Sequence, residues 1–149
     1  MEEPKRITPT KLGDYLEVMT KAAFQSGMSW KVVESKWEGF REVFAGFDPV
    51  AVASFTPDDV DRMATDTRVI RNRRKIEGTI QNAATLLAIE KEFGSFDKYL
   101  GSVDGFIPLV KDMRTRFKFV GGFGAYYFLY VVGQPVPPHE EAQALLQAL

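Results

Sequence analysis

The stretch Arg114-Thr-Arg-Phe-Lys-Phe-Val-Gly-Gly-Phe-Gly-Ala-Tyr126 decides how this chain folds. It places a turn with glycines at 121, 122 and 124 between two segments of helical periodicity, 107–115 and 123–132. Glycine tolerates positive φ angles and lets the backbone approach another molecule closely. The sequence therefore predicts two helices joined by a tight hairpin.

The hairpin has the features of an anion-binding site. The first amides of the helix after the turn lack partners within the helix and lie at the positive end of its dipole, which favours a phosphate. Lys118, Arg116 and Arg114 add positive charge beside it. A helix-hairpin-helix unit grips one DNA backbone phosphate in this way, without reading bases. A plain corner between two helices with a glycine turn is the alternative interpretation.

Helical signals continue on both sides of the hairpin. No segment alternates strictly between apolar and polar residues, so the expected fold class is all-α, a compact helical bundle forming a single domain over residues 1–149. We expect helices that start at the caps Thr8-Pro9, Asp48-Pro49 and Thr56-Pro57, and further helices over about 29–44 ended by Gly46, 69–93 ended by Gly94, 95–100 and 140–149.

Composition narrows the function classes. The net charge is −1, and the absence of cysteine excludes disulfides and thiolate metal sites. The N-terminus is polar, and the longest apolar stretch, 123–132, is too short to span a membrane, so we expect a cytoplasmic monomer without a membrane partner. Five basic residues between Arg68 and Lys75 are either a solvated surface paired with nearby acids or a local patch for nucleic acid.

Three ordered segments carry a resemblance to a known family. They are Phe24-Gln-Ser-Gly-Met-Ser-Trp30 with Phe44-Ala-Gly-Phe-Asp-Pro-Val50, Val69-Ile-Arg-Asn-Arg-Arg-Lys-Ile76 with Asn82-Ala83, and Phe117-Lys-Phe-Val-Gly121. In this order and spacing they resemble the 3-methyladenine DNA glycosylase I family over most of the chain, roughly Leu12 to Gly133.

The resemblance implies a helix-hairpin-helix DNA glycosylase that acts in base-excision repair. Such an enzyme extrudes a damaged nucleotide from duplex DNA and hydrolyses its N-glycosidic bond. The implied substrate is DNA containing an alkylated purine such as 3-methyladenine, met at the bacterial nucleoid, and no cofactor is implied.

The resemblance also implies site residues. Trp30, Phe24 and Ala22 fall at base-pocket positions, where an indole face would stack on a cationic methylated purine. For Trp30 the alternative is an ordinary core aromatic. The DNA wedge, a loop that enters the duplex, would consist of Gln25, Ser26, Gly27 and Met28, and the alternative for Met28 is a core methionine.

A second group of residues is expected to contact DNA phosphates. Arg71, Asn72, Arg73 and Lys75 either contact phosphate, brace the wedge loop or form an internal network with Glu77 or Asp66. The phosphate-binding residues we expect are Lys118, Val120, Gly121, Gly122, Arg71 and Arg73.

Two departures from the family pattern matter. Ala22 stands where the family has a pocket glutamate, and Asp14 is a weak substitute. The family's N-terminal segment and its zinc site have no counterpart, and the single histidine, His139, cannot form a tetrahedral site, so we expect no metal.

Glu140 and Glu141 are weak catalytic candidates, and the catalytic residues stay unassigned. Two alternatives therefore remain: a non-catalytic DNA-damage-binding protein, and a helical interaction domain unrelated to DNA.

Overall fold

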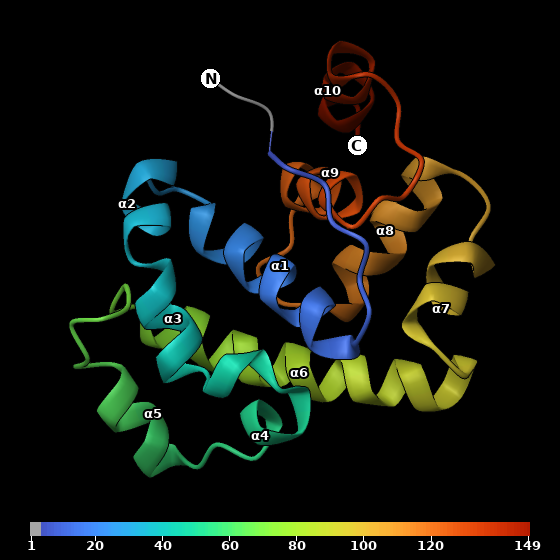
Figure 1. Ribbon diagram of the computed structural model, residues 1–149. Coiled ribbons are helices and arrows are strands. Elements are labelled where there is room, and N and C mark those ends of the chain that lie inside the picture. The colour runs from blue at the N-terminus through green and yellow to red at the C-terminus, as the bar shows by residue number, and fades with distance from the viewer. Residues whose placement is uncertain (1–3) are drawn as a thin grey trace.

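The computed structural model describes residues 4–149, and within this range the chain is helical and contains no strand (Figure 1). The expectation of an all-α fold is confirmed. The elements are α1 (Leu12–Gln25), α2 (Trp30–Ser35), α3 (Trp37–Val43), the 3-10 helix η1 (Ala45–Phe47), α4 (Pro49–Ala53), α5 (Pro57–Met63), α6 (Arg73–Phe93), α7 (Phe96–Ser102), α8 (Phe106–Arg116), α9 (Gly122–Val131) and α10 (His139–Gln147).

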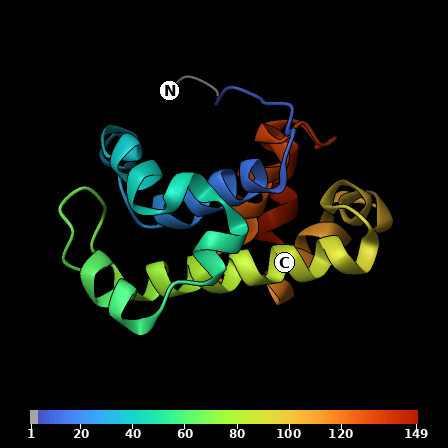
Figure 2. The same cartoon turned by 60° about the horizontal axis from the view of Figure 1, so that its bottom comes forward.

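The helices are organised around α1 and α6. Figures 1 and 2 show α6 running across the whole molecule, with α1 between it and α9. Leu16 and Met19 of α1, Ile76 and Leu86 of α6 and Phe128 of α9 are fully buried. Burying a large apolar side chain contributes about 1.5–3 kcal/mol, so this three-layer contact is one of the main sources of stability.

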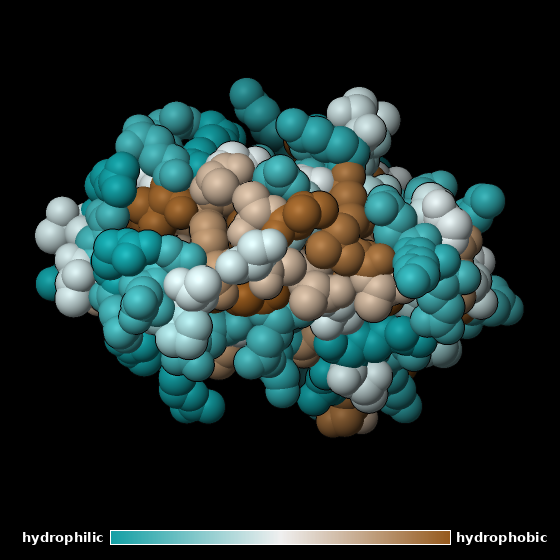
Figure 3. All heavy atoms as spheres, turned by 90° about the horizontal axis from the view of Figure 1, so that it is seen from below, coloured by the Kyte–Doolittle hydropathy of each residue, from teal (hydrophilic) through white to brown (hydrophobic). Residues whose placement is uncertain are grey.

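The outer face of α6 is partly apolar. Viewed from the α6 side, apolar side chains gather along the middle of the molecule, bordered by polar ones (Figure 3). Ile80 and Leu87 of this helix are only partly buried, and Ile80 packs against the core. Within residues 4–149 no helix is both long and apolar enough to cross a membrane.

The start of α6 differs from the sequence expectation. The helix begins at Arg73, because the side chain of Asn72 accepts a hydrogen bond from the backbone N–H of Lys75 at 3.1 Å and so caps it. Arg68 lies in a turn before the helix, where its N–H donates to Asp66. The predicted end at Gly94 is confirmed, with a φ of 91°.

The single helix expected over 29–44 is broken in two. At Lys36 the backbone leaves helical geometry, and its ammonium donates to the carbonyl of Thr67 at 2.9 Å. The break turns Trp37 and Phe40 into the core, whereas α2 buries only Val33. Tertiary packing overrides the continuous helical pattern here. The first helix also starts later than Thr8-Pro9, at Leu12, where the carboxylate of Asp14 accepts from the N–H of Thr10.

Helix α1 and η1 approach each other closely at Gly13. A Cβ atom at this position would lie 2.7 Å from the carbonyl oxygen of Phe47, closer than real contacts allow. We predict that Gly13→Ala lowers the free energy of unfolding by about 1–3 kcal/mol, because one backbone must move. Urea unfolding measures this change.

Gly101, on α7, is the matched control. A Cβ there meets no atom within 4 Å. Gly101→Ala is expected to leave stability unchanged or to raise it by about 0.4–1 kcal/mol. Equal unfolding midpoints for the two variants would contradict the close packing of η1 on α1.

Candidate functional site

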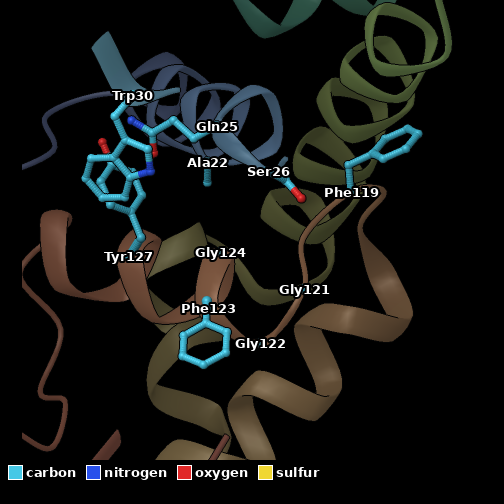
Figure 4. A pocket seen from close by; sticks show the side chains of 10 residues that line it. All are labelled: Ala22, Gln25, Ser26, Trp30, Phe119, Gly121, Gly122, Phe123, Gly124 and Tyr127. Atoms are coloured by element: carbon cyan, nitrogen blue, oxygen red, sulfur yellow. The ribbon is translucent and has the colours of Figure 1, made fainter. Parts of the chain in front are cut away.

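A cavity of about 260 Å³ opens where the end of α1, the start of α2 and the start of α9 meet (Figure 4). It combines segments that are separated by about a hundred positions in the sequence. Its lining residues are Ala22, Gln25, Ser26, Trp30, Phe119, Gly121, Gly122, Phe123, Gly124 and Tyr127. The loop after α1 and the glycine hairpin therefore face the same hollow.

Trp30 stands at the mouth of this cavity. It is the first residue of α2, its exposed fraction is 39%, and its ring meets that of Tyr127 edge-on at a centroid distance of 5.4 Å. The interpretation of Trp30 as a core aromatic is wrong. Its side chain is thus partly open to solvent and lines the cavity.

The expectation for Phe24 as a cavity wall needs correction. Phe24 is fully buried and packs against Phe40 at 4.8 Å, away from the cavity, whereas Ala22 lines it. The reason is geometric, since residues two positions apart on a helix point about 200° apart. Phe123 and Tyr127 of α9 supply aromatic wall instead.

Sequence reasoning missed these two aromatic residues. Helix α9 is apolar on all sides, so its pattern does not identify which side faces a cavity. The available signal was the spacing of two aromatics, four positions apart, directly after the glycine turn.

The polar groups of the cavity are uncharged at neutral pH. Burial raises the pKa of the Tyr127 hydroxyl to about 12, although the neighbouring amide of Gln25 acts in the opposite direction. None of the ten lining residues carries a carboxylate or a cation. The cavity therefore offers aromatic faces and neutral hydrogen-bonding groups to a ligand.

The segment Ser26–Ser29, which we call the wedge loop, lies exposed between α1 and α2. Gly27 adopts a φ of 74°, and Met28 is 39% exposed, so the core interpretation of Met28 is wrong. The expectation for Gln25 as part of the wedge needs correction, because Gln25 is the last residue of α1 and is buried there. The ammonium of Lys75, from α6, donates to the carbonyl oxygen of Ser26 at 2.6 Å. This contact ties the wedge loop to α6.

The hairpin joins α8 to α9. The side chain of Asn82 accepts from the N–H of Lys118 at 2.7 Å and donates to its carbonyl at 3.0 Å. Gly121 precedes α9, and its carbonyl receives the first helical hydrogen bond, from Ala125. The amides of residues 122–124 therefore come before the first bond of that helix and lie at its positive end.

Two hairpin residues are arranged differently from a simple phosphate grip. The side chain of Val120 is buried, so only its backbone could contact a ligand. Gly122 packs beneath α10, since a Cβ there would lie 3.2 Å from Leu146. Lys118 is exposed and makes no ion pair within residues 4–149.

The cations around the site fall into two groups. Arg73 pairs with Asp61 at 2.7 Å, and Arg116 pairs with Asp112 at the same distance. The internal-network interpretation thus describes Arg73, but with Asp61 as its partner in place of Glu77 or Asp66. Arg71 is exposed and has no carboxylate partner in the described part of the chain. Arg71 and Lys118 are the expected phosphate ligands with free charge.

The remaining acidic candidates lie outside the cavity. The carboxylate of Asp14 caps α1, at the far end of that helix from Gln25. Glu140 and Glu141 are exposed in the first turn of α10, and His139 lies beside the Tyr126 ring. Among residues 4–149 no three histidine, aspartate or glutamate side chains group as a metal site would require.

Comparisons with known proteins agree with this arrangement. The family model described as methyladenine glycosylase matches residues 11–116. The DNA-3-methyladenine glycosylase of Haemophilus influenzae is 37% identical over 89 residues, which are 60% of this chain and 48% of that protein. DNA-3-methyladenine glycosylase 1 of Escherichia coli is 33% identical over 130 residues, 73% of this chain and 70% of that protein.

A solved structure has the same arrangement of helices. The 3-methyladenine DNA glycosylase I of Staphylococcus aureus, in work on its recognition of 3-methyladenine, superimposes with a TM-score of 0.76 at 28% identity. The superposition covers 85% of this chain and 79% of that one. The chain spans about half the length of the Haemophilus relative and more than two thirds of the other two. By the extent of the family match and the shared fold, this chain belongs to the methyladenine glycosylase family.

Proposed function

We propose that this protein is a DNA glycosylase that removes an alkylated purine, such as 3-methyladenine, from duplex DNA. The observation that carries the proposal is the single cavity that brings Trp30 together with the glycines of the hairpin. The related proteins from three bacteria, named as 3-methyladenine glycosylases, support the same function. We expect one copy of the chain to act at the nucleoid.

Each part of the site has a role in this proposal. The amides at the start of α9 and the charge of Lys118 would hold one backbone phosphate. The wedge loop would enter the duplex at Met28 and fill the space left by the extruded base. That base would stack on Trp30. The cavity volume lies near the lower limit for ligand pockets, which leaves room for one bicyclic ring.

The chemistry would depend on the substrate more than on a catalytic side chain. A purine methylated at N3 is cationic, so the bond from N9 to C1′ breaks with its electron pair moving to a base that leaves neutral. Water then adds to C1′ and releases a proton to solvent. A pocket of the right shape, a stacking aromatic ring and a water molecule are then enough for the reaction, and no strong base is needed.

A second function is favoured by one observation, the absence of a carboxylate among the ten cavity residues. A protein with the wedge loop and hairpin but without a pocket anion would bind damaged DNA without cutting it. The deciding experiment incubates the purified protein with alkylated duplex DNA and measures free bases. Release of 3-methyladenine above a heat-depurination control supports the glycosylase, whereas salt-sensitive binding without release supports the second function.

Replacing Trp30 tests the stacking role. Trp30→Ala is expected to weaken base release, or binding to damaged DNA, roughly 5- to 150-fold, because base–aromatic stacking contributes about 1–3 kcal/mol. Val32→Ala is the matched control, since Val32 is equally exposed on the same helix but does not line the cavity. Equal effects of the two substitutions would contradict a role for Trp30 in binding the base.

Replacing Lys118 tests the phosphate grip. Lys118→Ala is expected to weaken binding to undamaged and damaged duplexes alike and to reduce the salt slope of log K by about 1. Lys98→Ala, an exposed lysine on α7, is the control and should leave the slope unchanged. An unchanged slope for Lys118→Ala would place the phosphate contact elsewhere.

Restoring a carboxylate tests the meaning of Ala22. Ala22→Glu is expected to raise excision of the cationic base roughly 10- to 100-fold, because a hydrogen bond to a charged group is worth about 1.5–3 kcal/mol. Ala22→Gln has nearly the same size without the charge, so it controls for shape. Excision kinetics on DNA containing 3-methyladenine compare the two, and an equal gain for Gln would contradict a charge effect.

A further inference from the structure

One face of α6 contacts both segments that face the cavity mouth. Lys75, Gly78 and Asn82 are spaced three and four positions apart, which places them on one side of the helix. Lys75 contacts the wedge loop, and Gly78 and Asn82 contact the hairpin. These contacts join segments that are far apart in the sequence to a single rigid element.

Lys75 is an unusual residue for the position it occupies. Only 9% of it is exposed, and it makes no ion pair within residues 4–149. Its ammonium lies 5.9 Å from the Phe24 ring and donates to the carbonyl oxygen of Ser26. Burial lowers the pKa of Lys75, as expected for a charge moved away from water. A buried cation without a carboxylate is costly, so packing alone does not account for a lysine here.

Asn82 fixes the hairpin with both ends of one amide. It is 2% exposed, and its two hydrogen bonds reach the N–H and the carbonyl of Lys118, 36 positions away. Between the two tethers, Gly78 admits the ring of Phe119, because a Cβ at 78 would lie 2.7 Å from a ring carbon. Phe119 in turn adopts a positive φ of 59°, a conformation rare for phenylalanine. The surrounding contacts hold the hairpin in this conformation.

We propose that Lys75 and Asn82 are positioning residues, which hold the wedge loop and the hairpin at a fixed separation along α6. In this view Lys75 governs insertion of the loop and extrusion of the base, whereas Asn82 governs the phosphate grip. Because the two tethers lie on one helix, a duplex gripped by the hairpin meets a loop that is already ordered. This inference rests on the proposed function for its meaning on DNA, but the tethers themselves belong to the free protein.

The first experiment uses the free protein and needs no DNA. Amide hydrogen exchange is measured for Lys75→Met, for Asn82→Ala and for Lys91→Met, an exposed lysine on the same helix. Lys75→Met is expected to speed exchange at residues 26–30 about tenfold and leave 117–122 unchanged, and Asn82→Ala to do the reverse, as local opening predicts. Lys91→Met should change neither segment. Unchanged exchange at 26–30 in Lys75→Met, or equal acceleration of both segments in both variants, overturns the inference.

The second experiment separates the two roles on DNA. The probe is a duplex with an abasic-site analogue opposite 2-aminopurine, whose fluorescence rises when it unstacks. Lys75→Met is expected to lose most of the fluorescence gain and to keep the wild-type salt slope, whereas Asn82→Ala loses affinity and salt slope together. A wild-type fluorescence gain in Lys75→Met overturns the positioning role. If the wild-type protein itself neither binds nor unstacks the duplex, the proposed function fails, and the exchange measurement still decides whether the tethers exist.

Discussion

The side-chain amide of Asn82 satisfies both backbone polar groups of Lys118, and the place of the hairpin depends on this pair of hydrogen bonds. A hairpin that exposes glycines has little side-chain surface with which to anchor itself, and its unpaired backbone groups must find partners. Asn82 provides them from the buried side of α6. The start of α9, and with it the aromatic wall of the cavity, is placed as a consequence.

The cavity is built from the ends of helices, and this decides its chemistry. The last turn of α1, the first residue of α2 and the first turns of α9 contribute small residues, aromatic rings and neutral polar groups. A site of this composition offers shape and stacking contacts to a flat ligand, and none of its lining side chains carries a charge with which to drive bond cleavage. For the proposed reaction this suits a base that methylation has already made a good leaving group.

Charge is distributed so that a nearly neutral chain can present a local positive surface. Arg68 is held by Asp66 and Glu42, Arg73 by Asp61, and Arg116 by Asp112. These pairs neutralise Arg68 and Arg73 within the basic run over residues 68–75, and Arg116 near the hairpin, whereas Arg71 has no carboxylate partner in the described part of the chain. Lys118, beside the positive end of α9, has no ion-pair partner in the described part of the chain. A polyanion could therefore be attracted to this surface even though the net charge of the whole chain is −1.

The sequence by itself determined the helical class, the proline and glycine boundaries of most helices, the hairpin and the family, because these are encoded in local caps, local periodicity and short motifs. It also indicated that the loop after α1 belongs with the hairpin. Only the tertiary structure decided that the helix expected over 29–44 breaks at Lys36, that Phe24 turns into the core and that Tyr127 faces the cavity. It also decided that Arg73 is already paired, while Lys75 reaches the wedge loop. Each of these depends on contacts between residues far apart in the chain. The local sequence pattern of a helix does not predict which other helix will pack against each of its faces.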